Sequence, residues 1–314
     1  MKKLALISSL VLILLAPFFG QIVIEINDIS DTSSVNYQIF WDIRVPKVIL
    51  AFLTGGILSL GGLIFQSIFK NPMGTPFTLG VASGATLFTA IGIVLGFVSF
   101  ISFFAFIGAL FTIVILFFIT NSLKTIQTTT LLLIGIALSF FYSACLMVMF
   151  FISDLSQSYE IVRFTMGSLD TVGFNDVYLL SFGALFMLFV ILKYKKELKL
   201  LLISNDFAQL KGIDVQKINY ILLFVVSIAV GICVSITGPI GFVGLIVPHI
   251  LKNIYKTSSD KLIIPVFFYG GIFLVFCDLL ARNLGGTSDI PIGVVSSFLG
   301  APFFIYLIIR RKNV

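Results

Sequence analysis

Residues 218–250 read INYILLFVVSIAVGICVSITGPIGFVGLIVPHI and contain no Asp, Glu, Lys or Arg. A helix that crosses a bilayer needs about 20 apolar residues, so this run is long enough for more than one helix. Proline and glycine interrupt helices, and Gly238–Pro239 divides the run into two predicted spans at 218–237 and 240–256. The stretch therefore predicts two membrane helices joined by a break whose backbone groups need partners from neighbouring helices.

The whole chain shares this apolar character. Its 314 residues are 59% apolar and 11% charged, and the mean hydropathy is +1.14. A soluble domain carries roughly 25% charged residues, so a water-facing surface cannot be built from this composition. Ten helices of about 20 residues each leave no room for a soluble catalytic domain. We predict an all-α, polytopic membrane protein that forms a single transmembrane domain over residues 1–314.

The few charged residues predict the number of spans and their sides. The sequence begins with Met1-Lys2-Lys3, and its last five residues, 310–314, read RRKNV. Cytoplasmic segments carry an excess of Lys and Arg, so both termini are predicted in the cytoplasm, which requires an even number of spans. The ten predicted spans are 4–24, 46–69, 77–97, 99–120, 129–152, 176–193, 218–237, 240–256, 261–282 and 291–309.

Alternating sides along these spans separates the charges. Of the 20 basic residues, only Arg44, Lys47, Arg163 and Arg282 fall on the outer side, which is otherwise acidic. The outer loops are predicted at 25–43 and 153–175. The longest inner connection, 194–217, mixes charges with short apolar runs at spacings that allow one or two amphipathic helices. It is either a linker lying on the membrane surface or a docking surface for a cytoplasmic partner.

Small residues are concentrated inside the spans, where they let helix backbones approach closely. Dense packing is the simplest role for them, and lining a path or hinging a gate is compatible with it. Two segments also resemble each other, because 62–71 (GLIFQSIFKN) and 244–253 (GLIVPHILKN) share six of ten residues. Both end a predicted span on the cytoplasmic side, as an internal duplication in a transporter would.

Several kinds of chemistry are missing from the sequence. No phosphate-binding G-x-x-x-x-G-K-[ST] loop occurs, so this chain is not expected to bind ATP. One histidine and three separated cysteines do not suggest a metal site, and no cofactor is predicted in this chain. Apart from Asp176 at the first position of the span 176–193, the predicted spans contain one carboxylate, Asp278, which could pair with Arg282 at i,i+4. If transport is active, its energy is expected to come from a partner chain.

Five motifs resemble a known family. They are RVPK (44–47), TGGILSLGGLIFQ (54–66), NPMGTPFTLGVASGA (71–85), GPIGFVGLIVPHI (238–250), and the pair Asp278–Arg282 with DIPIGVV (289–295). In this order they resemble the FecCD/BtuC type of ABC importer permease, whose members carry ferric siderophores, haem and cobalamin. Lys47, Met73, Gly74 and Asp289 depart mildly from the family pattern. The resemblance covers about residues 40–310.

The resemblance implies a type II ABC importer permease fold of about ten transmembrane helices. It also implies a second permease subunit, identical or related, and two cytoplasmic ATPase subunits that bind ATP and Mg²⁺. An extracytoplasmic substrate-binding protein delivers the ligand in this family, and no nucleic acid partner is expected. The protein is thus expected in the cytoplasmic membrane of a bacterium, as a permease subunit rather than an enzyme.

The resemblance also assigns roles to residues. Arg44, Lys47 and Arg282 match outer basic residues that dock the binding protein, although anchoring at the interface or internal pairing with Asp42 or Asp278 is the other interpretation. Residues 203–213 resemble the segment that couples the permease to its ATPase, with Ser204 and Lys211 departing from the pattern. The coupling positions are Asp206, Phe207, Ala208, Lys211 and Gly212. The implied path or packing positions are Gly55, Gly56, Gln66, Asn71, Pro72, Gly80, Gly84, Gly238, Pro239, Gly241, Gly244, Pro248 and His249.

The sequence therefore predicts the permease of an importer for an iron chelate or a related metal-organic ligand. An ATPase-independent channel or secondary carrier for a small solute is the alternative. The ligand itself and the choice between a homodimer and a heterodimer are not readable from the sequence.

Overall fold

The protein is described by a computed structural model over residues 2–22, 29–32, 34–122, 128–285 and 289–312. Within these ranges the regular structure is entirely helical. In chain order the helices are α1 (Lys2–Leu15), α2 (Val35–Gln38), α3 (Val45–Ile68), α4 (Val81–Val94), α5 (Ile101–Ser122), α6 (Thr128–Ile152), α7 (Leu155–Met166), α8 (Asn175–Lys193), α9 (Lys195–Ile203), α10 (Asn205–Leu210), α11 (Val215–Thr237), α12 (Val243–Tyr255), α13 (Ser259–Leu284) and α14 (Ile292–Lys312).

Each of the ten predicted spans contains one helix. Six described segments are long and apolar enough to cross a bilayer, namely 35–68, 98–116, 132–152, 175–193, 215–237 and 259–284. Four shorter apolar helices fill the remaining predicted spans, at 8–18, 81–94, 243–255 and 292–306. The prediction of an all-α membrane protein with about ten spans is confirmed.

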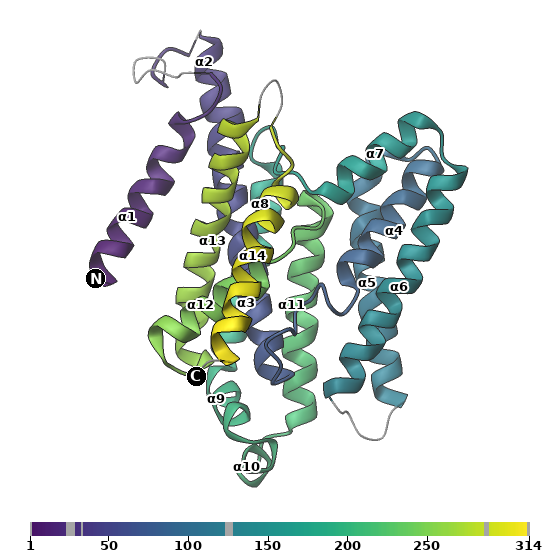
Figure 1. The fold of residues 1–314 in the computed structure, drawn as a ribbon, viewed down its shortest axis with the longest axis vertical. Coiled ribbons are helices and arrows are strands. Elements are labelled where there is room, and N and C mark those ends of the chain that lie inside the picture. The colour runs from purple at the N-terminus through teal and green to yellow at the C-terminus, as the bar shows by residue number, and fades with distance from the viewer. Residues whose placement is uncertain (1, 23–28, 33, 123–127, 286–288, 313–314) are drawn as a thin grey trace.

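The helices form a bundle around α3 (Figure 1). Helix α3 is apolar on all sides, as expected for a helix in the centre of a membrane protein, and nearly all of it is buried, including Leu50, Ile57, Leu63 and Phe65. It packs most extensively against α13 and also against α8, α11 and α12, while α4 to α7 form a second group at one side of the bundle. The outward faces of α6 and α8 expose large apolar side chains, which suits contact with lipid.

The two predicted outer loops contain helical structure that the prediction missed. In the loop 25–43, of which 25–28 and 33 lie outside the described residues, α2 and a π-helical turn at Ile39–Arg44 continue directly into α3. In the loop 153–175, α7 begins with a capping box. The Asp154 carboxylate accepts a hydrogen bond from the backbone N–H of Gln157, and the side-chain oxygen of Gln157 accepts one from the backbone N–H of Asp154. Such a cap satisfies the free amides of a helix start, which explains why a helix forms in a polar stretch.

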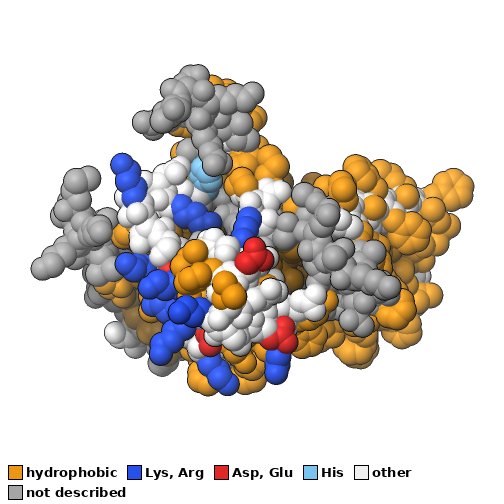
Figure 2. Space-filling model, turned by 90° about the horizontal axis from the view of Figure 1, so that it is seen from below, with side chains coloured by type: hydrophobic (Ala, Val, Ile, Leu, Met, Phe, Trp, Pro, Cys, Tyr) orange, Lys and Arg blue, Asp and Glu red, His pale blue; other side chains and the backbone are white. Residues whose placement is uncertain are grey.

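The opposite end of the bundle carries α9 and α10 (Figure 1). Helices α1 and α14 both have their terminal ends directed toward it. Seen from this end in Figure 2, lysine and arginine side chains gather on the face and acidic side chains are few. This distribution is the one expected of the predicted cytoplasmic side.

Candidate functional site

The short helix α10 is held in place by local hydrogen bonds. Ser204 caps its start by accepting from the Phe207 amide at 2.9 Å, the usual role of serine at this position. The chain leaves α10 through Gly212, whose φ of +81° suits glycine, and the Ile213 amide donates to the Ala208 carbonyl at 3.1 Å. The short helices predicted in 194–217 are thus present as α9 and α10. Hydrogen bonds fix both the start and the end of α10.

Helix α10 buries one face and exposes apolar side chains on the other. Ala208 is fully buried, whereas Phe207 is 37% and Leu210 85% exposed, and Ile203 at the end of α9 is 62% exposed. The Lys211 ammonium lies 5.8 Å from the centre of the Phe207 ring. Exposed apolar side chains on a helix outside the lipid region are typical of an interaction surface. Of the predicted coupling positions, Asp206, Phe207, Lys211 and Gly212 are exposed here, whereas Ala208 lies on the buried face of α10.

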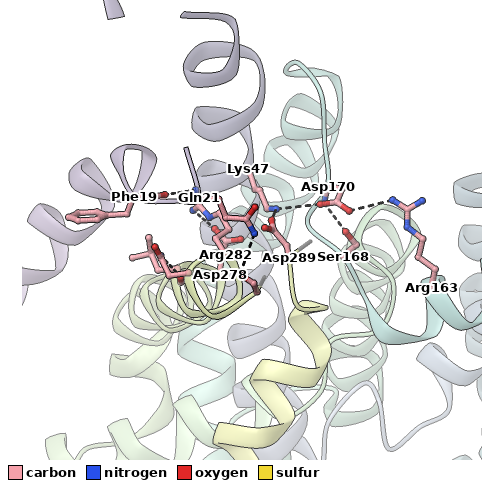
Figure 3. A network of polar contacts seen from close by, with 12 residues as sticks. Phe19, Gln21, Lys47, Arg163, Ser168, Asp170, Asp278, Arg282 and Asp289 are labelled. Atoms are coloured by element: carbon pink, nitrogen blue, oxygen red, sulfur yellow. Dashed lines mark hydrogen bonds and ion pairs between the residues drawn. The ribbon is translucent and has the colours of Figure 1, made fainter. Parts of the chain in front are cut away.

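A cluster of charged residues lies at the other end of the bundle (Figure 3). The Lys47 ammonium, at the start of α3, lies 2.6 Å from the Asp289 carboxylate and 3.3 Å from that of Asp170. Arg163, near the end of α7, lies 3.5 Å from the second oxygen of Asp170. Lys47 thereby joins the loop after α7 to the segment before α14. These residues border a cavity of about 580 Å³ between α7, α13 and α14.

Asp170 keeps its negative charge in this cluster. Partial burial alone would raise the pKa of its carboxyl group, but hydrogen bonding to Ser168 and the charge of Lys47 outweigh burial and lower that pKa below its usual value of 3.8. A carboxyl group with a lowered pKa stabilises the fold at pH values above its unfolded pKa, and loses that contribution only as the pH falls through the folded value. The bridge to Lys47 is therefore present throughout the physiological pH range.

Arg44 and Arg282 fasten the N-terminal helix to the bundle. Arg44 donates to the carbonyl oxygens of Pro17, Phe18 and Ile22, just beyond α1. Arg282 pairs with Asp278 one turn earlier on α13, as the i,i+4 spacing predicts, and its second contact is with the Phe19 carbonyl.

The three outer basic residues thus have internal partners. The exposed fractions of Arg44, Lys47 and Arg282 are only 6%, 7% and 5%. The predicted internal pair of Arg282 with Asp278 is present. Arg44 contacts backbone carbonyl groups rather than Asp42, and Lys47 pairs with carboxylates that the prediction did not name. Docking of a binding protein through them stays a prediction. Arg163, which the motifs do not include, is the basic side chain of this cluster that is more than half exposed.

The glycine motifs mark places where helices touch backbone to backbone. A Cβ added at Gly62 would lie 1.7 Å from the Gly244 carbonyl oxygen, and one at Gly244 would lie 2.5 Å from the Leu58 carbonyl oxygen. The Gln66 amide donates to the Gly244 carbonyl at 3.3 Å. The two similar segments 62–71 and 244–253 therefore cross each other at their first glycines, where the backbones of α3 and α12 are in direct contact.

The other motif positions divide between packing and turns. Gly55 faces the Gly270 carbonyl, Gly56 the Phe267 ring and Gly84 the Thr112 hydroxyl, each closer than an added Cβ could tolerate. Positive φ angles occur at Gly80, before α4, and at Gly238, after α11. Asn71 and Pro72 form the turn after α3, Pro239 and Gly241 lie in the break before α12, and Pro248 and His249 lie within α12. This geometry establishes packing roles, and a role in lining the path stays a prediction.

The comparison with known proteins agrees with this architecture. A family model described as the FecCD transport family matches residues 7–310. The chain belongs to the FecCD transport family.

Relatives of this FecCD chain cover most of its length. It is 32% identical to a probable iron chelatin transport system permease protein of Helicobacter pylori, over 88% of this chain and 84% of that protein. It is 31% identical to the hemin transport system permease protein HmuU of Yersinia pestis, over 90% of this chain and 87% of that protein. A solved structure of a metal-chelate type ABC transporter in an inward-facing conformation superposes with a TM-score of 0.87 and 26% identity, covering 99% of this chain and 100% of that one.

Some residues of the FecCD chain's outer cluster were missed by the sequence argument. Asp170 belongs to none of the motifs. Its position depends on α7, a helix that was not expected in the outer loop. Asp289 was noted only as a mild departure from the family pattern. The bridging role of Lys47 depends on three segments meeting in space, and no spacing along the chain reveals that.

Proposed function

We propose that this chain is the transmembrane permease subunit of a binding-protein-dependent ABC importer. Its cargo is an iron chelate, such as a siderophore or haem, or a related metal-organic ligand, and it crosses the cytoplasmic membrane of a bacterium. The observation that carries the proposal is the exposed apolar side of α10, which projects from the lysine-rich end of a membrane bundle. The cargo class is supported by the relatives from Helicobacter pylori and Yersinia pestis, which are described as iron chelatin and hemin permeases.

The proposed assembly contains two permease subunits, identical or related, and two ATPase subunits on the cytoplasmic side. ATP binding closes the ATPase dimer, which moves the attached α10 helices and rocks the permeases between outward and inward access. A substrate-binding protein delivers the ligand from outside, with Arg44, Lys47, Arg163 and Arg282 near its docking face. A loss of binding-protein affinity in Lys47→Met, at unchanged thermal stability, supports docking through Lys47, and unchanged affinity contradicts it.

A secondary carrier fits the structure less well. Carboxylates buried in the membrane usually carry the coupling ion in such carriers. Apart from Asp176 at the first position of the span 176–193, the predicted spans contain a single one, Asp278, and it is paired with Arg282. A carrier mechanism would leave the exposed apolar side of α10 without a role.

Substituting both Phe207→Ser and Leu210→Ser tests the coupling role of α10. We expect ATP-driven uptake to fall roughly tenfold or more, because removing a central apolar anchor of an interface typically costs 2 kcal/mol or more. Uptake is measured in proteoliposomes that contain the permease, its ATPase and the binding protein. The matched control is Gln209→Ser, an exposed polar position on the same helix, which should leave uptake unchanged.

The same samples separate loss of coupling from loss of folding. Binding-protein docking and the thermal midpoint of the permease should be unchanged in the Phe207/Leu210 variant. If uptake survives even the replacement of the whole segment 206–212, the coupling assignment is wrong.

A further inference from the structure

The apolar surface of the bundle contains a cavity. A cavity of about 520 Å³ lies between α1, α12 and α13. Aliphatic and aromatic side chains line it, among them Leu12 of α1, Ile250 and Ile254 of α12, and Ile272 and Phe276 of α13. Two tyrosines, Tyr255 and Tyr269, are the polar members of its lining, and no charged residue belongs to it.

Helix α1 packs on the bundle through Leu12 and Ile13 and is also held by hydrogen bonds at its outer end. Arg44 holds the carbonyl groups that follow α1, and Arg282 and Gln21 add contacts at the same end. Toward its N-terminus α1 stands away from the bundle (Figure 1). Its outward residues Leu10 and Leu14 are 45% and 71% exposed, as is usual for a helix in lipid. The space between α1 and α13 is thus an apolar groove inside the hydrocarbon layer.

Positive charge lies where this groove approaches the lysine-rich end of the bundle. Lys256 follows the groove residue Tyr255 directly, and Lys261 lies in the first turn of α13. Both lysines are exposed, and neither makes an ion pair with any residue that the structure describes. The acid between them, Asp260, is buried at 4% exposure. By the sidedness of the charges, this end faces the cytoplasmic leaflet.

We propose that the groove binds an anionic phospholipid of the cytoplasmic leaflet. One acyl chain occupies the space between α1 and α13, where water would find no partners. The phosphate group lies at the α12–α13 turn, within reach of Lys256 and Lys261. Basic pockets between transmembrane helices on the cytoplasmic side are suited to anionic headgroups. The lipid chain fills the space that α1, α12 and α13 leave between them.

This proposal does not depend on the ATPase or the cargo, so it can be tested on the purified full-length permease. The probes are phosphatidylglycerol and phosphatidylcholine with identical acyl chains, added to delipidated protein in detergent. Bound lipid is counted by native mass spectrometry, and the thermal midpoint is measured in parallel. We expect phosphatidylglycerol to bind at least about tenfold more tightly, a difference of about 1.4 kcal/mol, and to raise the thermal midpoint more than phosphatidylcholine does.

Two variants separate the headgroup from the acyl chain. Lys256→Gln combined with Lys261→Gln should remove the preference for phosphatidylglycerol and leave phosphatidylcholine binding unchanged. Ile272→Trp, which fills the groove, should abolish the tight site for both lipids. Leu185→Trp on α8, an exposed position away from the groove, is the control and should retain it.

Two results overturn the proposal. The first is equal affinity of the wild-type protein for the two lipids. The second is disulfide cross-linking of two chains through Ile254→Cys in protein that lacks Cys145, Cys233 and Cys277, because the groove would then be covered by a second copy.

Discussion

Gly62→Ala is expected to destabilise the permease severely, although it adds a single methyl group. That methyl carbon would lie 1.7 Å from the Gly244 carbonyl oxygen and 2.5 Å from its carbonyl carbon. Both atoms belong to the backbone of α12, so relief requires α3 and α12 to separate along their whole crossing. Overpacking in a core costs about 1–3 kcal/mol and occasionally more, and we expect a loss of about 3 kcal/mol or greater. The thermal midpoint, followed by fluorescence-detected gel filtration, measures it.

The matched control for Gly62 is Gly241→Ala, in the glycine-rich motif 238–250 that also contains Gly244. The nearest atom to a Cβ at Gly241 is the Ser297 hydroxyl oxygen at 3.7 Å, an ordinary contact. This variant should stay within about 0.5 kcal/mol of the wild type. Equal thermal midpoints for the two variants would contradict the close crossing of α3 and α12.

Arg282→Met is expected to cost about 3–5 kcal/mol, because it leaves the Asp278 carboxylate buried without its partner. Asp278 is only 1% exposed and lies on α13, one turn before Arg282. The cost comes from the unpaired charge and not from the missing contact alone. The double variant Asp278→Leu with Arg282→Met should therefore recover most of the lost stability, since replacing a whole buried pair with apolar groups is often neutral. Thermal midpoints of the two variants give the comparison.

Arg163→Met is the control for the Arg282 experiment. The Arg163–Asp170 pair is more than half exposed on both sides, and exposed ion pairs contribute about 0–1 kcal/mol. We expect a change in that range. If the double variant at Asp278 and Arg282 is as unstable as Arg282→Met alone, the unpaired Asp278 carboxylate is not the cause of the lost stability.

The membrane-spanning helices could be predicted from the sequence, whereas the helical structure in the two outer loops could not. The apolar runs determine the spans directly, because a bilayer requires their length and composition. Helix α7 was missed because its apolar content is low, and its start depends on the Asp154–Gln157 capping box, a short-range signal in a polar stretch. The π-helical turn before α3 was missed because no apolar pattern distinguishes it from a loop.

The residues of the candidate sites also differ in how far the sequence predicts them. The predicted coupling positions lie together because they fall within seven residues, 206–212, so that the motif alone predicts where they are. The outer basic residues are different, because the charge pattern predicts their side of the membrane but not their burial. Lys47 is buried because Asp170 and Asp289 come to it from segments more than 100 residues away in sequence. Contacts of this kind depend on the packed bundle, and a single sequence does not reveal them.

In our account, a separate ATPase chain binds the exposed side of α10 and powers transport through this permease. The most direct test measures uptake of a ferric siderophore into proteoliposomes that contain the permease and its ATPase, with the binding protein outside and either ATP–Mg²⁺ or no nucleotide inside. Our account predicts uptake that requires the nucleotide, the ATPase and the binding protein together. Equal uptake by the purified permease alone in nucleotide-free liposomes would contradict it.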